Sequence, residues 1–266
     1  MYSGRATHIL SESGTAVVDR GAGPVVALAH GAGGGVLENF SVLLDHAPGL
    51  RFVGPSWPGS GGTPLTAAPL ALEDLADRTV AAAVSRGAVR FPIVGLSLGA
   101  AVAVTAAHRH PDHVSALVLT VGVARSDFRV RTVTDTIRVL ASAGVRDELA
   151  AYVVSVASSD ATLRVLPQAE IEEARIAVRD TMPEGMAAQF DLAGRVDVTG
   201  LLPGIAVPTM VVVAGGDRLV PADIAREFGA VPGSRVVEYA GAGHIFTPPE
   251  AGEWAGEVAD FLRATE

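Results

Sequence analysis

The chain has 266 residues, of which 49% are hydrophobic and only 5% aromatic, and its formal net charge is -9. This length fits one large α/β domain or a domain with an insertion, and the negative charge argues against a nucleic-acid-binding surface, which needs clustered Lys or Arg. All 20 basic residues are Arg and there is no Cys, which excludes a Schiff-base lysine, a P-loop lysine, a thiol nucleophile, disulfides and thiolate metal ligands.

The N-terminal stretch MYSGRATHIL contains no long apolar segment of the kind found in signal peptides. No apolar run approaches the roughly 20 residues that a membrane-spanning helix needs. We therefore expect a soluble cytoplasmic protein without nucleic-acid or membrane partners. Nothing in the sequence indicates an oligomeric state.

The first 20 residues are typical of an antiparallel hairpin at a sheet edge, and short apolar runs then alternate with helical patterns. Such alternation is typical of βαβ units and predicts a mainly parallel sheet covered on both faces. The predicted strands are Val25–Ala29, Arg51–Pro55, Phe91–Leu96, Val114–Val121, Thr209–Ala214 and Arg235–Tyr239, and the predicted helices are Leu70–Arg86, Leu98–His110, Ala222–Phe228 and Glu250–Arg263.

The alternation stops between Arg125 and about Gly204. This segment is mostly helical in pattern, with interruptions at Pro167 and Pro183 and no convincing strand. It indicates a helical insertion that forms a cap over the sheet edge. We therefore predict a core domain of residues 1–124 and 205–266 and a cap of residues 125–204.

A glycine-rich loop, HGAGGG, follows the first predicted parallel strand at His30. Such a loop can bind a phosphate, or it can bring backbone N–H groups close to a reacting carbonyl oxygen. A dinucleotide-binding G-x-G-x-x-G motif from Gly31 would need glycine where Val36 stands. The next strand ends in Pro55 and Ser56, with no acid to bind a ribose, so the dinucleotide interpretation fails.

The segment GLSLG places Ser97 between Gly95 and Gly99, directly after a predicted strand and at the start of a helix. This G-x-S-x-G context is typical of a nucleophilic serine on a strained turn, and the helix N-terminus favours developing negative charge. Asp217, in GGDRLVP, and His244, in GAGH, each follow a later strand. Because the carboxyl ends of parallel strands share one sheet edge, we expect a base and its orienting acid to meet Ser97 there.

With HGAGG, GLSLG, GGDRLVP and GAGH in this order, nearly the whole chain resembles the α/β-hydrolase superfamily of the cap-bearing, serine-nucleophile type. The resemblance implies a mostly parallel eight-stranded sheet with helices on both faces, a helical cap, and no cofactor or metal. It also implies a nucleophile at Ser97, an orienting acid at Asp217 and a general base, then acid, at His244. The oxyanion hole would come from the N–H groups of Ala32 and Leu98.

The sequence departs from the family pattern at two positions. Ser56, in GPSWPGSGGTP, stands where an Asp is usual, and Ala100 stands where a second Gly is commoner. We expect the first departure to alter the structure of the loop without abolishing catalysis, and the second to alter helix packing slightly.

Other residues offer competing assignments. Asp127 also follows a strand and is the alternative acid, whereas Asp223 is expected to cap or solvate the helix after it. The H-x-H-x-x-H pattern of His108, His110 and His113 suggests a metal, but its context is that of a helix end before a strand. His30 is expected to stabilise its loop. A solvated helix face is expected from four residues of the cap: Glu172, Glu173, Arg175 and Arg179. The alternative is that one of these Arg residues binds the substrate.

These residues predict hydrolysis of an ester, thioester, lactone or amide of a small organic substrate. A lyase, C–C bond hydrolase or cyclase on the same fold, and a non-enzymatic small-molecule receptor, stay open as alternatives. The serine argues against haloalkane dehalogenase and epoxide hydrolase chemistry, which uses an Asp nucleophile in this fold. The expected substrate pocket, mainly aliphatic, is lined by Gly31, Trp57, Phe128, Tyr152, Met186, Phe190 and Ile245.

Overall fold

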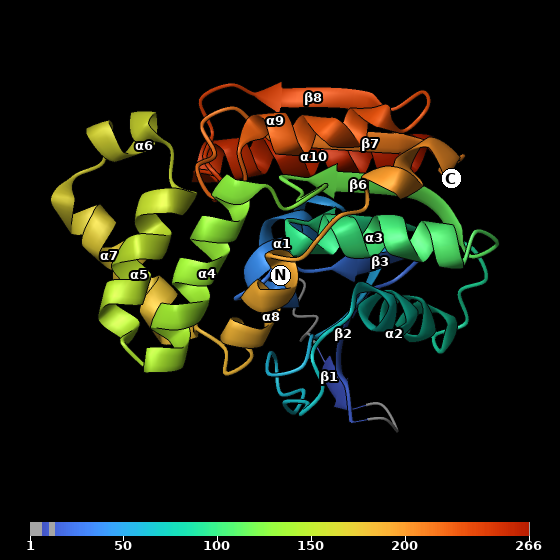
Figure 1. Cartoon of the computed structure of the whole chain (residues 1–266). Coiled ribbons are helices and arrows are strands. Elements are labelled where there is room, and N and C mark those ends of the chain that lie inside the picture. Colours follow the sequence, from blue (N-terminus) through green and yellow to red (C-terminus); the bar gives the residue numbers. More distant parts are fainter. Residues whose placement is uncertain (1–6, 11–13, 266) are drawn as a thin grey trace.

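The computed structural model describes residues 7–10 and 14–265, and an eight-stranded sheet forms its centre (Figure 1). The strand order is β1-β2-β4-β3-β5-β6-β7-β8. β1 and β2 run antiparallel to their neighbours, whereas β3 to β8 are parallel. The strands are β1 (Thr7–Leu10), β2 (Ala16–Gly21), β3 (Val25–Ala29), β4 (Arg51–Pro55), β5 (Phe91–Leu96), β6 (Val114–Thr120), β7 (Thr209–Ala214) and β8 (Arg235–Tyr239).

The predicted strands and the mostly parallel sheet are confirmed. The expected edge hairpin is present as β1 and β2, and the rest of that prediction falls on residues 1–6 and 11–13, outside the described residues. The one difference is at Val121, which was expected to end β6. Its φ of 42° lies outside the extended region, so the strand stops at Thr120.

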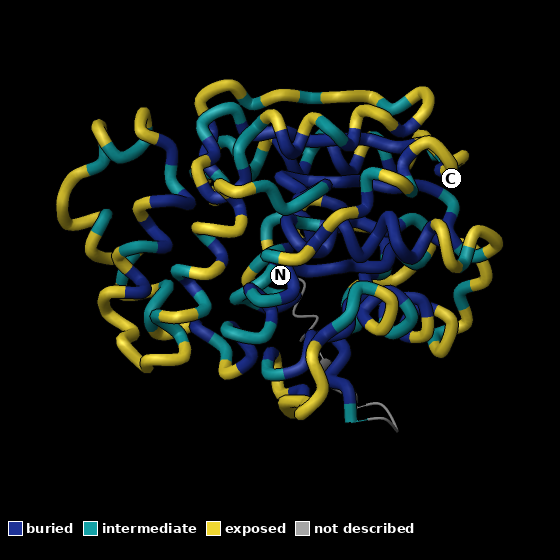
Figure 2. The backbone as a smooth tube through the Cα atoms, viewed as in Figure 1, coloured by how far each residue is buried: buried dark blue, intermediate teal, exposed yellow. Residues whose placement is uncertain are grey.

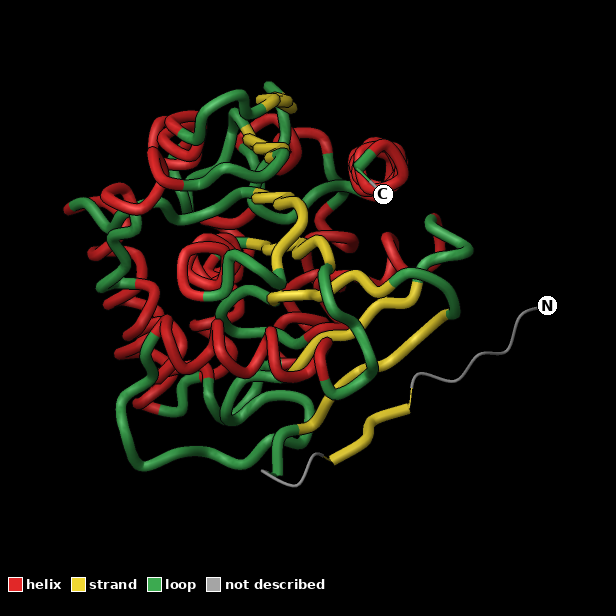
Figure 3. Tube along the Cα trace, turned by 90° about the vertical axis from the view of Figure 1, so that its right-hand side faces the viewer, coloured by secondary structure: helices red, strands yellow, loops and turns green. Residues whose placement is uncertain are grey.

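Helices cover both faces of the sheet (Figure 3). The helices of the core are α1 (Val36–His46), α2 (Leu72–Val84), α3 (Leu98–Arg109), α9 (Ala222–Arg226) and α10 (Pro248–Ala264), with a short 3₁₀ helix η2 (Glu227–Ala230) after α9. The sequence patterns missed α1, because glycines precede it and Gly35 provides no side-chain cap. Its buried Val36, Phe40, Leu43 and Leu44 have the spacing of one helical face, which is a usable signal.

The two faces of the sheet bury the two largest hydrophobic clusters of the described residues. α1 and α10 pack on one face, where Phe40 and Val258 share a cluster with Leu28 of β3. α2 and α3 pack on the other face, where Val80 shares a cluster with Ala27 of β3. Residues 98–107 of α3 are all buried, and the tube in Figure 2 is dark there. Alanines make this close packing possible, which explains how a chain poor in aromatic residues fills its core.

The segment between β6 and β7 is helical, as its pattern predicts. It contains α4 (Phe128–Ala143), α5 (Arg146–Ala157), α6 (Asp160–Val165), α7 (Gln168–Thr181), α8 (Met186–Ala193) and a 3₁₀ helix η1 (Thr199–Gly204). Pro167 immediately precedes α7, and Pro183 lies between α7 and α8. α4 to α7 project to one side of the sheet, on the left in Figure 1.

Two glycines make the turn from β5 to α3 possible. A methyl group on Gly99 would overlap the carbonyl oxygen of Ala29, at the end of β3, and one on Gly95 would overlap the carbonyl oxygen of Gly99. The start of α3 therefore lies directly against β3 and β5, at a distance that only glycine permits.

We predict that Gly99→Ala destabilises the protein by at least about 2 kcal/mol, because the added methyl meets rigid backbone and not a flexible side chain. Gly256→Ala is the matched control: the same change lies in α10, where nothing is within 4 Å of the new methyl. It should be neutral or stabilise by up to about 1 kcal/mol, since alanine favours helix. Urea unfolding measures the stability of both variants. Equal changes in their free energies of unfolding would contradict the close contact of α3 with β3.

Candidate active site

Ser97 lies on the sharp turn between β5 and α3, with φ 56° and ψ -118°. Its N–H donates to the carbonyl of Thr120 at 2.9 Å, and its own carbonyl accepts from the N–H of Ala100 at 3.0 Å. Among the described residues, only Ser97 and Val121 have a positive φ without being glycine, and both line the same pocket. Backbone strain of this kind costs about 1–3 kcal/mol per residue and is typical of functional sites.

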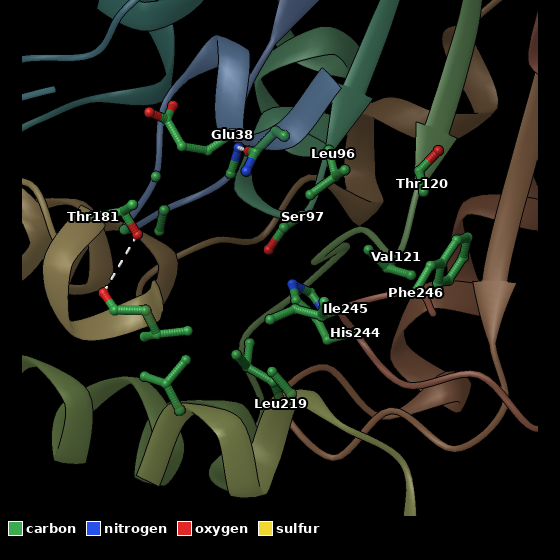
Figure 4. A pocket seen from close by; sticks show the side chains of 18 of the residues that line it. Glu38, Leu96, Ser97, Thr120, Val121, Thr181, Leu219, His244, Ile245 and Phe246 are labelled. Atoms are coloured by element: carbon green, nitrogen blue, oxygen red, sulfur yellow. Dashed lines mark hydrogen bonds between the residues drawn. The ribbon is translucent and has the colours of Figure 1, made fainter. Parts of the chain in front are cut away.

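Asp217 and His244 follow β7 and β8 and form a close pair. His244 Nδ1 lies 2.6 Å from Asp217 Oδ2, and the other carboxylate oxygen accepts from the N–H groups of Leu219 and Val220, both at 2.8 Å. The Asp217 side chain is 1% exposed and that of His244 10%. An Nδ1–H donated to the carboxylate leaves Nε2 of His244 as a hydrogen-bond acceptor. Ser97 and His244 project into the same pocket (Figure 4).

The loop of residues 31–35 passes directly over Ser97. A methyl group on Gly31 would lie 3.2 Å from Ser97 Cβ. The N–H of Gly31 donates to Asn39 Oδ1 at 2.7 Å, and the N–H of Gly33 donates to Gln189 Oε1 at 2.8 Å. Among the described residues, no group accepts a hydrogen bond from the N–H of Ala32 between them, or from that of Leu98 at the start of α3. Two backbone donors are thus available beside the serine.

Ser97, His244 and Ala32 line a cavity of about 330 Å³. The lining includes four residues that the sequence analysis assigned to a substrate pocket: Gly31, Met186, Phe190 and Ile245. Helices α5, α7 and α8 supply a largely apolar wall that the sequence did not single out in full: Val153, Ala157, Val178 and Thr181, beside Met186 and Phe190. On the side of the core, α1 and α10 contribute Glu38, Asn39, Ser41, Val42, Ala251 and Trp254.

Three expected pocket residues do not line this cavity, and those assignments are corrected. Trp57 is fully buried in the core, where it stacks on His30 with ring centroids 4.6 Å apart. Phe128 is 80% exposed at the start of α4. Tyr152 packs against the core, while the next residue of α5, Val153, faces the cavity, because successive helical side chains point about 100° apart.

A family model described as the alpha/beta hydrolase fold matches residues 24–249, which is most of the chain. The chain belongs to the α/β-hydrolase family. It is 29% identical over 247 residues to RutD of Klebsiella pneumoniae (strain 342), which is named as a proposed carbamate hydrolase, and the match covers 91% of this chain and 92% of RutD.

Two further comparisons agree with this family. The chain is 29% identical over 254 residues to a pimeloyl-[acyl-carrier protein] methyl ester esterase of Neisseria meningitidis serogroup C, covering 89% of this chain and 93% of the esterase. A solved structure of a thermophilic esterase from Thermogutta terrifontis superposes with a TM-score of 0.76 at 26% identity, covering 97% of each chain.

In this α/β-hydrolase, the residues that offered competing assignments form contacts with other side chains or with the backbone. Asp127 caps α4 by accepting from the N–H groups of Arg129 and Val130, both at 2.9 Å. Asp223 forms an ion pair with Arg129 at 2.6 Å. His110 bonds to Asp77 at 2.7 Å. Asp217 is therefore the acid that the structure pairs with His244.

Apart from His30, the remaining charged and histidine residues that the sequence singled out are exposed or half-buried and lie outside the lining of the cavity. His113 Nδ1 lies 2.7 Å from the carbonyl of Val89, and Arg175 and Arg179 on α7 both form ion pairs with Asp147. Within residues 7–10 and 14–265, no group of three or more His, Cys, Asp or Glu is arranged to hold a metal ion. In the same part of the chain, no helix is long and apolar enough to cross a membrane.

The family's usual Asp is replaced by Ser56, whose buried hydroxyl has no hydrogen-bond partner among the described residues. Thr63 holds this loop instead: its hydroxyl donates to the carbonyl of Ser56 at 2.9 Å and accepts from the N–H of Ala16 at 2.9 Å. The loop 56–63 is therefore fixed by backbone and threonine hydrogen bonds and not by the side chain at position 56.

His30 stabilises the glycine-rich loop, as expected. Its Nδ1 lies 2.7 Å from the carbonyl of Gly31, and its Nε2 accepts from the N–H of Trp57 at 2.9 Å. Complete burial disfavours the charged ring and lowers the pKa of His30 to about 3. The imidazole is therefore neutral, with the proton on Nδ1.

This burial predicts an acid-sensitive fold. The pKa of His30 falls from 6.5 to about 3 on folding, so below pH 6.5 the unfolded chain binds a proton that the native state does not. This contribution to the free energy of unfolding is fully present above pH 6.5 and is lost progressively as the pH falls toward 3. Between pH 7 and pH 5 the loss is about 2 kcal/mol. His30→Gln keeps an acceptor for the N–H of Trp57 but removes the titrating ring. Between pH 7 and pH 5, its free energy of unfolding in urea should therefore fall by about 2 kcal/mol less than that of the wild type. His108→Gln, at the exposed end of α3, controls for the substitution, and equal pH dependence in all three proteins would count against the buried neutral ring.

Proposed function

We propose that this protein is a serine hydrolase that cleaves an ester, thioester, lactone or amide of a small organic substrate through an acyl-enzyme on Ser97. The observation that carries the proposal is that His244, hydrogen-bonded to Asp217, lines the same pocket as a serine on a positive-φ turn. The names of the relatives, an esterase and a proposed carbamate hydrolase, support hydrolysis at a carbonyl carbon.

In this mechanism, His244 Nε2 accepts the proton of the Ser97 hydroxyl as Oγ bonds to the carbonyl carbon. The carbonyl π electrons move to the oxygen, and the N–H groups of Ala32 and Leu98 stabilise the resulting oxyanion, each by about 3 kcal/mol. When the oxyanion collapses, the bond to the leaving group breaks and His244 gives that group its proton. A water then repeats both steps on the acyl-enzyme, releasing the acid and restoring Ser97.

Asp217 has an orienting role here. Its carboxylate holds the Nδ1–H of His244 and stabilises the imidazolium that forms when Nε2 takes the proton. Two backbone N–H groups fix that carboxylate, so the ring presents Nε2 toward the pocket.

We further propose that residues 125–204 act as a cap that binds the apolar part of the substrate. The support is the wall formed by Val153, Ala157, Val178, Met186 and Phe190, which belongs entirely to α5, α7 and α8. A pocket of this composition favours an aliphatic substituent over a charged one.

Wild-type protein should react covalently with a fluorophosphonate at Ser97, because the probe traps an activated serine, and Ser97→Ala should lose both labelling and esterase activity. Mass spectrometry locates the adduct. Thermal unfolding of the variant is the control, since its fold should be retained. Unlabelled wild-type protein, or labelling that persists in the variant, is incompatible with the proposal.

A p-nitrophenyl acetate burst with an amplitude near one per active site indicates an accumulating acyl-enzyme when deacylation limits turnover. Turnover of another substrate without a trapped acyl group would favour the lyase, C–C bond hydrolase or cyclase alternative. Binding without multiple turnovers would favour a receptor.

Val178→Trp should narrow the cavity along its apolar wall. The ratio of kcat/KM for p-nitrophenyl hexanoate to that for the acetate should therefore fall about tenfold. That is the effect of displacing roughly two methylenes at about 0.8 kcal/mol each. Ile176→Trp is the matched control, because Ile176 lies on the same helix but is 37% exposed and outside the lining. An equal loss of kcat/KM for both esters, or in both variants, would contradict the proposal that the cap binds the acyl chain.

A further inference from the structure

Gln189 is a fully buried polar side chain that joins three separate segments of the chain. It lies on α8, in the segment between β6 and β7, and is 0% exposed. Its Oε1 accepts from the N–H of Gly33 at 2.8 Å, while its Nε2 donates to the carbonyl of Pro58 at 3.2 Å and to the hydroxyl of Ser60 at 2.9 Å. Both polar atoms of the amide are thus used, as a buried amide requires.

Ser60 closes a ring of hydrogen bonds around the glycine-rich loop. Its hydroxyl accepts from Gln189 and donates to the carbonyl of Gly34 at 2.7 Å. The loop is therefore held on both sides of the Gly33–Gly34 peptide, through an N–H and a carbonyl. All these links lead back to one side chain on α8.

The packing around this ring leaves little room for movement. A methyl group on Gly33 would lie 2.8 Å from the Phe190 ring, and one on Gly59 would overlap the backbone of Gly185. The N–H of Gly185 donates to the carbonyl of Gly59 at 3.1 Å, just before α8 begins. The start of α8 is thus in backbone contact with the loop 56–63, which fixes where the Gln189 amide lies.

We propose that Gln189 is a positioning residue for the oxyanion donor at Ala32. The N–H of Gly31 is held by Asn39 and that of Gly33 by Gln189, so the direction of the intervening Ala32 N–H is set from both sides. Met186 and Phe190, which line the pocket, lie on the same helix. The cap helix that contacts the substrate therefore also aims the donor that stabilises its reacting oxygen.

This inference rests on the proposed function, because it assigns Ala32 an oxyanion. A purely structural Gln189 would only attach α8 to the core, and its loss would lower stability without a specific effect on the transition state. The two roles differ in how they affect kcat, the affinity for an oxyanion mimic and the mobility of the loop.

The test compares Gln189→Leu, which keeps the volume and removes every hydrogen bond, with Leu192→Ala, which removes buried packing from the same helix. We expect Gln189→Leu to lower kcat by about 10- to 100-fold, less than the loss of an entire donor, with KM within about threefold. Affinity for an aryl trifluoromethyl ketone, which forms an oxyanion on the serine, should fall by the same factor as kcat/KM. Leu192→Ala should lower the melting temperature, whereas its kcat and its affinity for the ketone should stay within about twofold of wild type.

Amide hydrogen exchange of residues 31–35, followed by mass spectrometry in the absence of substrate, gives a readout that needs no activity. Exchange should be faster in Gln189→Leu and unchanged in Leu192→Ala. Unchanged exchange, or a kcat and ketone affinity within twofold of wild type in Gln189→Leu, would overturn the proposal. So would equal kinetic losses in the two variants. Failure of the wild type to react with a fluorophosphonate would instead refute the proposed hydrolase, and the exchange data would then decide alone whether Gln189 holds the loop.

Discussion

The close approach of α3 to the end of β3 is the constraint on which the site depends. Gly99 permits it, because any side chain there would overlap the carbonyl of Ala29. The approach brings Ser97 under the glycine-rich loop and leaves the N–H of Leu98 beside it. The positive φ of Ser97 is an unfavourable conformation, and its hydrogen bond to Thr120 and the burial of residues 98–107 of α3 offset that cost. Asp217 and His244 then reach the same edge simply because β7 and β8 are parallel to β5.

Buried but uncharged side chains hold the loops at this edge. His30 is neutral and uses both ring nitrogens between the loop 31–35 and Trp57, and Gln189 uses both polar atoms of its amide between that loop and residues 58–60. Neutral groups suit this task, because a buried charge would need a partner of its own and would change the electrostatics at the oxyanion. Ser56, in place of the family's Asp, removes one buried carboxyl from the same region.

The sequence predicted strands β3 to β8 almost residue by residue, because β-branched apolar runs bounded by turn residues have few alternatives. It predicted the Ser97, Asp217 and His244 assignment from motif order, and the structure pairs the last two. It failed for the pocket wall. Tyr152 and Phe128 are larger and more conspicuous than Val153 and Ala157, but the phase of α5 and the exposed start of α4 decide which side chains face the cavity. Helix phase relative to a cavity depends on packing against other helices, and no local pattern in this segment records it.

The amino-acid sequence by itself determined the local elements: where strands begin and end, where glycine allows a turn, and which side chains follow each strand. Those properties depend on backbone sterics and on neighbours within a few residues. The tertiary structure alone decided that Gln189 bonds to Gly33, 156 residues away, that Trp57 stacks on His30, and that α7 supplies part of the pocket wall. Such partnerships depend on the relative placement of distant segments, which is fixed only when their apolar faces are buried together.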